Sequence, residues 1–544
     1  FQKKYDETVT FVAGILDKLE GPEEQGQAHF MVGSAHFFKD RFAEATISLA
    51  ASLEAAPKGG QADEALLYLA RSQYMQKKMA EARATLERLL GDFPEGRHKG
   101  QAHYRLGEVL DAEKKPAEAI KQYDQLLEAF AKSPYVPYAM YNKGYDLLGL
   151  DEVDAAAAIF AELVKQFPDH EIKKEALIAQ ADTGYRRGRG QLDDKKFEEA
   201  IASLKILYDA YPEFPRRDAV LYDLGWAYLG AGKQAEAVEA FVGITKDYKE
   251  STFVADAYYR IGEDQYKNNK FGEALASYTL ALESKPAAEI HEAILHKTGW
   301  AHYKLDDFSK AKETFQAQVK DYAEGPFAGD GRFMLSECQF KQGKWEEALG
   351  LYMSLVDAKL SAGQFTELVL LHGGQSARQL KKFDESLALL NKLFKDHPGS
   401  DYLPQAQLTA GRAHYGKKDY DKADKLFAVV ATGSRNATGA EARFYMGAIM
   451  FLQKEHALAI RQYQRVMFGF GAEKALDEVK KFQHLSATEA AVCSEVLAGG
   501  AKTAAEKDKF LTEAKGFYQY ILENHAESGS AANAKKRLAE LNKG

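Results

Sequence analysis

The sequence predicts an all-α solenoid of about twelve helix-turn-helix repeats, on three observations. Alanine, leucine, lysine and glutamate are abundant and only 13 of the 544 residues are proline, a composition that favours helix over sheet or disorder. Pairs of small residues twelve positions apart recur along the chain, most often every 37 residues. A ring or a leucine commonly follows the second small residue by four positions, and a proline often follows it by twelve.

The small-residue pairs mark twelve repeat units. The first members of successive pairs lie 37, 37, 37, 44, 37, 37, 37, 37, 38, 37 and 36 residues apart, which is too regular for chance. The pairs are Gly33 with Ala45, Ala70 with Ala82, Gly107 with Ala119, Gly144 with Ala156, Gly188 with Ala200, Gly225 with Ala237, Gly262 with Ala274, Gly299 with Ala311, Ser336 with Ala348, Gly374 with Ser386, Gly411 with Ala423, and Gly447 with Ala459.

Each unit predicts two antiparallel helices. The small residues let the helices approach closely and the ring fills the seam between them. Proline stops the second helix, because its ring clashes with the preceding turn and it lacks an N–H. The seam positions include Leu86, Tyr123, Phe160, Leu204, Phe241, Tyr278, Phe315, Tyr352 and Phe427, and the prolines are Pro57, Pro94, Pro168, Pro212, Pro286 and Pro398.

This pattern resembles the tetratricopeptide repeat, whose usual period is about 34 residues. The resemblance implies a right-handed superhelix whose first helices line the concave side. The longer period indicates about three extra residues in the connections. Segments such as GDFPEGRHKGQAHYRLGEVL look like a bacterial cell-envelope branch of the family, which includes the Tol–Pal coordinator protein and the lipoprotein of outer-membrane β-barrel assembly.

Two irregularities set the expected domain organisation. The 44-residue step from Gly144 to Gly188 predicts a two-turn insertion near residues 170–190. After Ala459, the segment FGFGAEKALDEVKK stands where other repeats have a proline followed by the first helix of the next repeat. We therefore expect an N-terminal helix or partial repeat over 1–26, the repeat array over 27–470, and a modified terminal repeat with capping helices over 471–544.

The predicted binding surface is an aromatic column on the concave side. Register places there the residue three before each first small residue, with the residues one and four after it. Rings concentrate at these positions, and aromatic side chains dominate binding hot spots; packing between helices is the alternative. The candidate partner-binding residues are Tyr104, Tyr141, Tyr145, Tyr222, Trp226, Tyr259, Tyr266, His296, Trp300, Tyr303, Phe333 and Phe340.

A second candidate is basic. The segment YRRGRG brings together Arg186, Arg187 and Arg189. They are expected either to contact an anion or acidic partner or to form an ordinary solvated helix end.

Several function classes find no support in the sequence. The formal net charge of −8 gives no reason to expect nucleic acid, and no apolar run is long enough to span a bilayer. Motifs of zinc proteases, phosphate loops and nucleophile elbows are absent at their required spacings, and Cys338 and Cys493 are expected to be packed thiols. We expect no cofactor, no metal and no catalysis. Co-chaperone members of the family use a clamp of Lys and Asn, whereas the matching positions here hold Arg71, Glu108, Tyr145, Arg189 and Trp226.

These observations favour a non-enzymatic scaffold that binds a protein or peptide in its concave groove, in a bacterial periplasm or cell envelope, with the cytoplasm as the alternative. A structural subunit of a larger assembly or filament is the second hypothesis, which accessible apolar surface near the C-terminal end would favour. Recognition of a carbohydrate or polymer is the third, which a ligand-sized pocket within one or two repeats would favour. Because the sequence begins at Phe1 rather than Met, we expect a fragment or a processed product.

Overall fold

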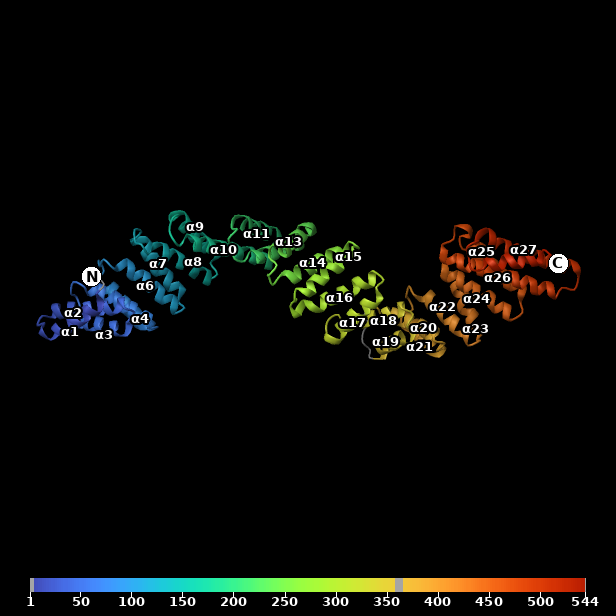
Figure 1. The fold of residues 1–544 in the computed structure, drawn as a ribbon, viewed down its shortest axis with the longest axis horizontal. Coiled ribbons are helices and arrows are strands. Elements are labelled where there is room, and N and C mark those ends of the chain that lie inside the picture. The colour runs from blue at the N-terminus through green and yellow to red at the C-terminus, as the bar shows by residue number, and fades with distance from the viewer. Residues whose placement is uncertain (1–3, 358–364, 544) are drawn as a thin grey trace. The chain divides into compact units, whose positions relative to one another are not determined.

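The computed structural model describes residues 4–357 and 365–543, which form 28 α-helices and no β-strand. This confirms the predicted all-α repeat fold. The chain divides into two compact units, Phe1–Ile261 and Gly262–Gly544, and within each unit consecutive helices pack against one another in chain order (Figure 1). None of the helices in the described ranges is long and apolar enough to cross a membrane.

Twelve helix pairs correspond to the twelve repeats predicted from the small residues. An N-terminal helix α1 (Tyr5–Ile15) and a short 3-10 helix η1 (Leu16–Lys18) precede them. The first helices of the pairs are α2 (Pro22–Phe38), α4 (Ala62–Met75), α6 (Lys99–Ala112), α8 (Val136–Gly149), α10 (Lys173–Asp193), α12 (Arg217–Gly230), α14 (Val254–Lys267), α16 (Ala288–Lys304), α18 (Ala328–Lys341), α20 (Thr366–Gln379), α22 (Leu403–Gly416) and α24 (Ala437–Leu452).

The second helices begin a few residues after each first helix ends. Where a proline follows, the second helix stops two or three residues before it, as α5 does before Pro94. They are α3 (Phe42–Ala55), α5 (Met79–Asp92), α7 (Pro116–Ala129), α9 (Val153–Gln166), α11 (Phe197–Ala210), α13 (Gln234–Asp247), α15 (Phe271–Glu283), α17 (Phe308–Asp321), α19 (Trp345–Asp357), α21 (Phe383–Asp396), α23 (Tyr420–Gly433) and α25 (His456–Gly469).

In ten of the twelve pairs, the seam is built from a glycine opposite a large side chain. A Cβ added at Gly107 would stand 2.3 Å from the Tyr123 ring, and one at Gly144 would stand 2.4 Å from the ring of Phe160. Both rings are fully buried. The absence of a side chain on the first helix therefore makes the space that the ring of the second helix fills.

A residue in the left-handed region ends the first helix of every repeat. It lies seven positions after the small residue, with φ between 57° and 76°. Only Gly232 and Gly343 are glycines, for which this conformation costs little. The other ten are Asp40, Lys77, Lys114, Asp151, Lys195, Asn269, Asp306, Lys381, Lys418 and Lys454.

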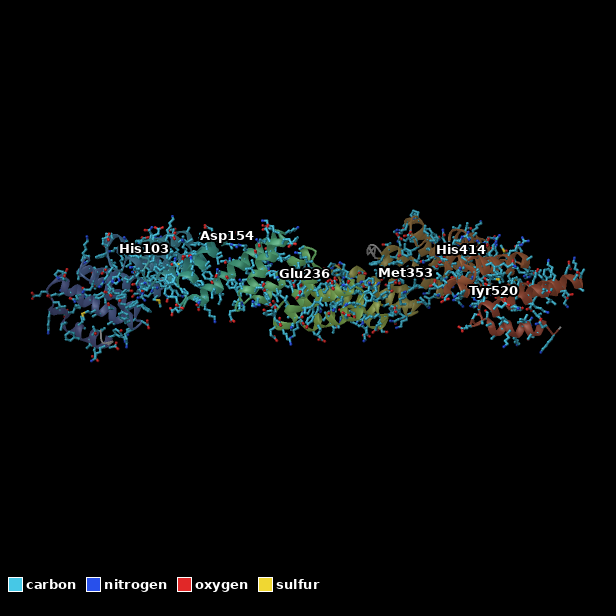
Figure 2. The ribbon with its side chains drawn as sticks, turned by 90° about the horizontal axis from the view of Figure 1, so that it is seen from above. His103, Asp154, Glu236, Met353, His414 and Tyr520 are labelled. Atoms are coloured by element: carbon cyan, nitrogen blue, oxygen red, sulfur yellow. The ribbon has the colours of Figure 1, made fainter. Side chains whose placement is uncertain are left out.

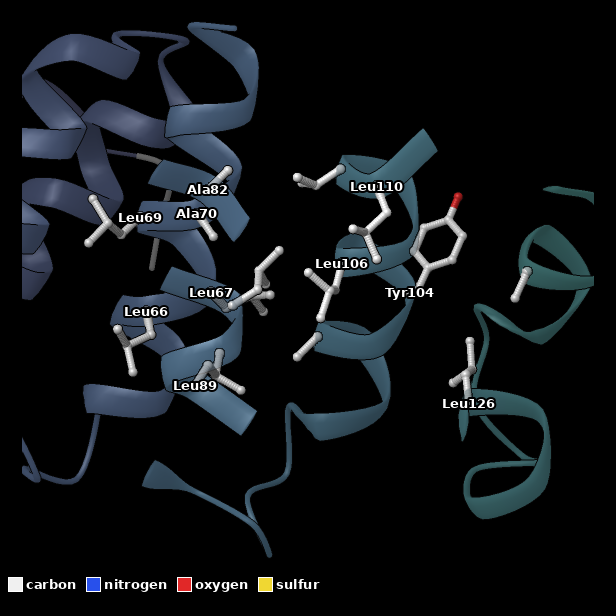
Figure 3. Packing of buried hydrophobic residues seen from close by; sticks show 14 of the residues in the cluster. Leu66, Leu67, Leu69, Ala70, Ala82, Leu89, Tyr104, Leu106, Leu110 and Leu126 are labelled. Carbon is white, nitrogen blue, oxygen red and sulfur yellow. The ribbon is translucent and has the colours of Figure 1, made fainter. Parts of the chain in front are cut away.

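Buried leucines join neighbouring repeats. In the first unit, Leu67 of α4 points toward Leu106 of α6 (Figure 3), and Leu66 of α4 and Leu89 of α5 belong to the same buried cluster. The same cluster continues through Leu126 of α7. Each pair thus buries its apolar faces against the next, as expected of a solenoid.

Helix α10 has 21 residues where α8 and α12 have 14 each, so it is longer by 21 − 14 = 7 residues, about two turns. The extra turns lie on the N-terminal side of Gly188. They leave beside the end of α11 a cleft of about 340 Å³, lined by apolar side chains that include Leu177, Ile178, Tyr211 and Phe214.

After α25 the repeat pattern changes. Gly471, with φ of 93°, turns the chain into the short helix η3 (Ala472–Lys474), and the helices α26 (Asp477–Gly499), α27 (Ala504–Asn524) and α28 (Ala531–Leu541) follow. Thr503 and Glu506 form a capping box at the start of α27. Tyr463, Cys493, Tyr518 and neighbouring apolar residues form the core of this segment.

Candidate functional site

The column residues lie in both units, Tyr104 to Tyr259 in the first and Tyr266 to Phe340 in the second. Four of them, Tyr104, Tyr259, His296 and Phe333, are buried. In four repeats, the column residue stacks on an aromatic residue that immediately precedes the first helix of the next repeat. The centroid distances are 5.1 Å for Tyr104 on Tyr135, 4.3 Å for Tyr222 on Phe253, 4.7 Å for His296 on Phe327 and 4.4 Å for Phe333 on Phe365. This part of the column therefore joins repeats and positions the side chains one turn further along.

Accessible rings in the first unit stand beside these packed ones. Tyr145 is 42% exposed, and its centroid lies 5.0 Å from that of Tyr141. Trp226 is half-buried next to Tyr222, with the guanidinium of Arg260 lying 4.5 Å from the centroid of the indole. The Tyr222 hydroxyl donates to Asp256 Oδ2 at 2.7 Å, and Asp256 also pairs with Arg260 at 3.2 Å. The cation is thus held over one face of the tryptophan.

In the second unit, Trp300 belongs to a polar cluster. Trp300 Nε1 donates to His296 Nε2 at 3.1 Å and to Asp330 Oδ2 at 3.4 Å, and Asp330 Oδ2 lies 2.9 Å from His296 Nε2. The Lys304 ammonium lies 5.8 Å from the centroid of the Trp300 ring. Trp300 is half-buried and its orientation is fixed by these contacts, which is what a binding platform requires.

Three further candidates of the second unit close the turn between two helices. Each is half-buried and meets, edge to face, the aromatic residue that starts the second helix. The centroid distances are 5.1 Å for Tyr266 with Phe271, 5.2 Å for Tyr303 with Phe308 and 5.3 Å for Phe340 with Trp345. These rings both stabilise their own repeat and expose one edge.

The charges on the first helices are largely neutralised between neighbouring repeats. An acidic residue of one first helix pairs with a basic residue 29 to 35 positions away on the next or previous one. The distances are 3.2 Å for Asp223 with Arg189, 2.9 Å for Glu263 with Lys297, 2.7 Å for Glu337 with His372 and 2.8 Å for Glu441 with Arg412. The mixed charge on this face therefore fixes the spacing of repeats, and the accessible rings are its distinguishing feature.

The arginines of the lengthened α10 also have acidic neighbours. Arg186 pairs with Asp182 at 3.0 Å, and Arg187 reaches Asp154 of α9, which is labelled in Figure 2. Arg189 pairs with the buried Asp223. About half of each arginine side chain is still exposed. Contact with an anion or an acidic partner would therefore compete with existing ion pairs.

A pocket that the sequence did not reveal lies on the first helices of the N-terminal repeats. Its volume is about 340 Å³, and residues of three successive first helices, α2, α4 and α6, contribute to it. Phe38 and Met75 are exposed at its wall, 47% and 57% respectively. The Arg71 guanidinium lies 4.6 Å from the ring centroid of Phe37 and has no ion pair within 4.0 Å in the described part of the chain, although Asp40 and Glu108 also line the pocket. An apolar wall with an unpaired cation suits an apolar side chain next to a negative group.

Burial and the nearby charge of Arg105 lower the pKa of Arg71. Arg105 itself is engaged, because it donates to Glu108 at 2.6 Å. Arg71 is therefore the free cation of the pocket's described side chains. The signal in the sequence was the basic residue one position after the small residue Ala70, but the unpaired state could be seen only once the neighbouring helices were placed.

Two carboxyl groups meet beside the seam of the third and fourth repeats. Tyr123 donates to Asp111 Oδ2 at 2.5 Å, and Asn142 donates to the Tyr123 hydroxyl at 3.2 Å. Burial, followed by the charge of Asp111, raises the pKa of Asp146 to about 8. Burial also raises the pKa of Asp111. The pair therefore holds a proton at neutral pH and contributes less negative charge than two separate aspartates.

Within the described ranges, no group of three or more His, Cys, Asp or Glu side chains is arranged to hold a metal ion. Both cysteines are buried and unpaired, and burial raises the pKa of the Cys338 and Cys493 thiols to about 12. They are therefore protonated, packed thiols rather than nucleophiles.

Models of the tetratricopeptide repeat match the sequence at six places. One model matches residues 64–96, 101–133, 138–170 and 368–400, and a second matches residues 185–245 and 296–362. The chain thus carries tetratricopeptide repeats in both units. No curated protein sequence matches it significantly.

Solved structures resemble the chain distantly. A Naa15/Naa10 complex bound to HypK-THB is 14% identical over 95% of this chain and 92% of that one, with a TM-score of 0.36. A tetratricopeptide repeat protein from Parabacteroides merdae is 16% identical over 55% and 99%, with a TM-score of 0.27. A MamA RS-1 ArsTM double mutant is 19% identical over 35% and 96%, with a TM-score of 0.25. Similarity at this level carries no conclusion about function.

Proposed function

We propose that this chain, which carries tetratricopeptide repeats, is a non-enzymatic scaffold that binds a protein or peptide. The proposed binding surface is the first-helix face, which consists of the column residues and the pocket around Arg71 on the first helices of the pairs. Repeats of this kind generally mediate protein–protein interactions. The observation that carries the proposal is the combination of accessible, oriented rings with the pocket around Arg71 on the same set of helices. Rigid aromatic side chains offer large contact area at low entropic cost.

The pocket favours an extended peptide as the ligand. It draws on three successive first helices, a length of contact that an extended peptide can match. An apolar side chain of the peptide would pack on Phe38 and Met75, and an acidic group next to it would pair with Arg71. Since Arg71 is partly desolvated, such a pair would be stronger than one in open water.

The column residues offer further contacts within each unit. Tyr145 and Trp226 in the first unit, and Trp300 in the second, are the column residues best placed to meet a partner, because they are accessible and their orientation is fixed. The buried members Tyr104, Tyr259, His296 and Phe333 would act as positioning residues.

The test is a comparison of variants as baits in quantitative pull-downs from the native organism. Trp226→Ala/Trp300→Ala and Arg71→Ala should each lose the same partner while keeping helical content and melting temperature. Ile206→Ala/Val429→Ala is the matched control, since these residues are exposed apolar positions on second helices, one in each unit. Retention of every partner by the tryptophan and arginine variants would refute binding on the first-helix face.

We also propose a bacterial cell envelope as the compartment. The support is the likeness of segments such as GDFPEGRHKGQAHYRLGEVL to the envelope branch of the repeat family. Fractionation of the native organism tests it: the protein should leave the cells with the periplasmic fraction when the outer membrane is opened. Recovery with a cytoplasmic marker enzyme would refute it.

A structural role in a larger assembly is a second candidate, favoured by apolar side chains exposed near the C-terminal end. Phe468 is 57% exposed, Leu476 74% and Val496 45%. An apolar surface of this kind suits contact with another chain. Sedimentation over a range of concentrations tests it: wild type should associate and Leu476→Glu should not. A monomer at every concentration would leave no support for end-to-end assembly.

A further inference from the structure

Four arginines converge on one pocket outside the first-helix column. Arg435 precedes α24, Arg443 lies on α24, and Arg461 and Arg465 lie one turn apart on α25. With Gln464 and Phe468 among the other lining residues, they enclose about 570 Å³. All belong to the second unit.

This pocket is unusual because its charge is not neutralised. Among the side chains that the structure describes, those lining the pocket include no carboxylate, and Arg435, Arg461 and Arg465 have no acidic partner within 4.0 Å. Helix α25 itself contains no Asp or Glu. The chain as a whole carries a formal charge of −8, so this local positive charge does not follow from composition.

Arg443 is held in place from the side of the second helices. It donates to Gln462 Oε1 of α25 at 3.0 Å and to the carbonyl oxygen of Ala431 of α23 at 3.1 Å. Burial, followed by the charges of Arg465 and Arg435, lowers its pKa. Arg461 and Arg465 are exposed, as is Arg435, so their guanidinium groups are available to a ligand.

An apolar edge adjoins the arginines. Phe468 is 57% exposed, and its ring meets that of Tyr520 on α27 with centroids 5.4 Å apart. The Tyr520 hydroxyl donates to the carbonyl oxygen of Met467 at 3.1 Å. The exposed ring therefore has a fixed position next to the cations.

We propose that the pocket formed by Arg435, Arg443, Arg461 and Arg465 binds an acidic peptide segment of a partner protein, with an apolar side chain of that segment packed on Phe468. Guanidinium groups pair with carboxylates in a planar, two-bonded geometry. Like charges gathered on one helix destabilise it unless a counter-charge is present, and an acidic ligand supplies that charge.

The shape and charge of the site favour a peptide over other anions. A volume of about 570 Å³ exceeds what a single phosphate fills, and the exposed ring gives an apolar contact that a bare ion would not use. A nucleic acid would need a basic track along its backbone, whereas this positive charge is confined to one pocket of an acidic chain. The proposal rests on the proposed function only in taking a protein as the partner.

The experiment uses the full chain and a fluorescein-labelled peptide, Glu-Glu-Leu-Glu-Glu, in an anisotropy titration at low salt. A Gln-Gln-Leu-Gln-Gln peptide tests whether charge is required, and a single-stranded oligonucleotide serves as competitor. The variant is Arg461→Gln/Arg465→Gln, whose side chains are exposed, so the fold should survive. Lys507→Gln/Lys509→Gln is the matched control, since it removes two charges from exposed positions of α27.

We expect the glutamate peptide to bind wild type and the lysine variant alike, to weaken about tenfold or more on the arginine variant, and to weaken with added salt. Equal weakening on both variants, no weakening on either, or equal binding of the glutamine peptide would overturn the proposal. Tighter binding of the oligonucleotide than of the peptide at the arginines would overturn it in favour of nucleic acid. The Trp226→Ala/Trp300→Ala test is independent of these outcomes, because that variant keeps all four arginines.

Discussion

Charged side chains are largely paired with opposite charges on the first-helix face and are unpaired in the arginine pocket. On the first helices, Asp223 lies 3.2 Å from Arg189 and Glu263 lies 2.9 Å from Lys297, so successive repeats neutralise one another. In the pocket around Arg461 and Arg465, the described lining has four cations and no acid. The first arrangement adds to the stability of the array and the second subtracts from it. Unpaired charge of the second kind is therefore the better indicator of a ligand.

Removing the cation that pairs with a buried carboxylate should have the largest effect. Asp223 is buried, and Arg189→Gln leaves its carboxylate without its cation. We expect a loss of about 1–3 kcal/mol in the free energy of unfolding, measured by urea denaturation. Arg186→Gln is the control: Asp182 keeps Arg216 as a partner, and the change should stay below about 0.5 kcal/mol. Similar losses in the two variants would remove the distinction between structural and available charge.

The paired carboxyls Asp111 and Asp146 should give the next largest effect, visible in the pH dependence of stability. The pKa of Asp146 in the folded state, about 8, lies above its ordinary value of 3.8. The folded state therefore binds the proton more tightly, so stability falls as pH rises between those two values. Asp146→Asn should melt about 2–4 °C higher than wild type at pH 9, with a flatter pH profile. Asp209→Asn, at an exposed position of α11, should change little; matching pH profiles for wild type and Asp146→Asn would contradict the shared proton.

The smallest effect should come from relieving repulsion in the arginine pocket. Arg461→Gln/Arg465→Gln removes two like charges one turn apart and should raise the free energy of unfolding by about 0.2–0.5 kcal/mol at low ionic strength. The gain should fade in about 1 M salt, where charges are screened within about 3 Å. Thermal melts with and without salt measure it, with Lys507→Gln/Lys509→Gln alongside. A destabilised arginine variant would mean that the four cations already have partners within the chain.

The period of the sequence was enough to predict the repeats. A glycine and a ring 16 positions apart, such as Gly107 and Tyr123, report one contact inside one repeat, and the structure has that contact. Local signals of this kind are readable because both partners belong to the same short unit. The match of prolines to the ends of second helices has the same origin.

The solvent exposure of individual column side chains was harder to predict from the sequence. Tyr104 and Tyr141 occupy the same position in successive first helices, yet Tyr104 is buried and Tyr141 is half-buried. Tyr104 stacks on Tyr135 of the connection to the next repeat, a contact between repeats that the period alone does not reveal. The arginine pocket was missed for a related reason, because its members come from a loop and two helices. The absence of acidic residues from α25 was a signal that the sequence did contain.

The left-handed residue that ends every first helix has a consequence for folding. Ten repeats place Asp, Asn or Lys there, each at an intrinsic cost of about 1 kcal/mol relative to glycine. Because this backbone strain recurs in nearly every repeat, each repeat needs a stabilising contribution that offsets it. In a linear array, that contribution comes from packing against the neighbouring repeats. An isolated repeat should therefore be unfolded, and shortened versions of either unit should gain stability with each repeat added. The rate of that gain would measure the coupling between neighbouring repeats.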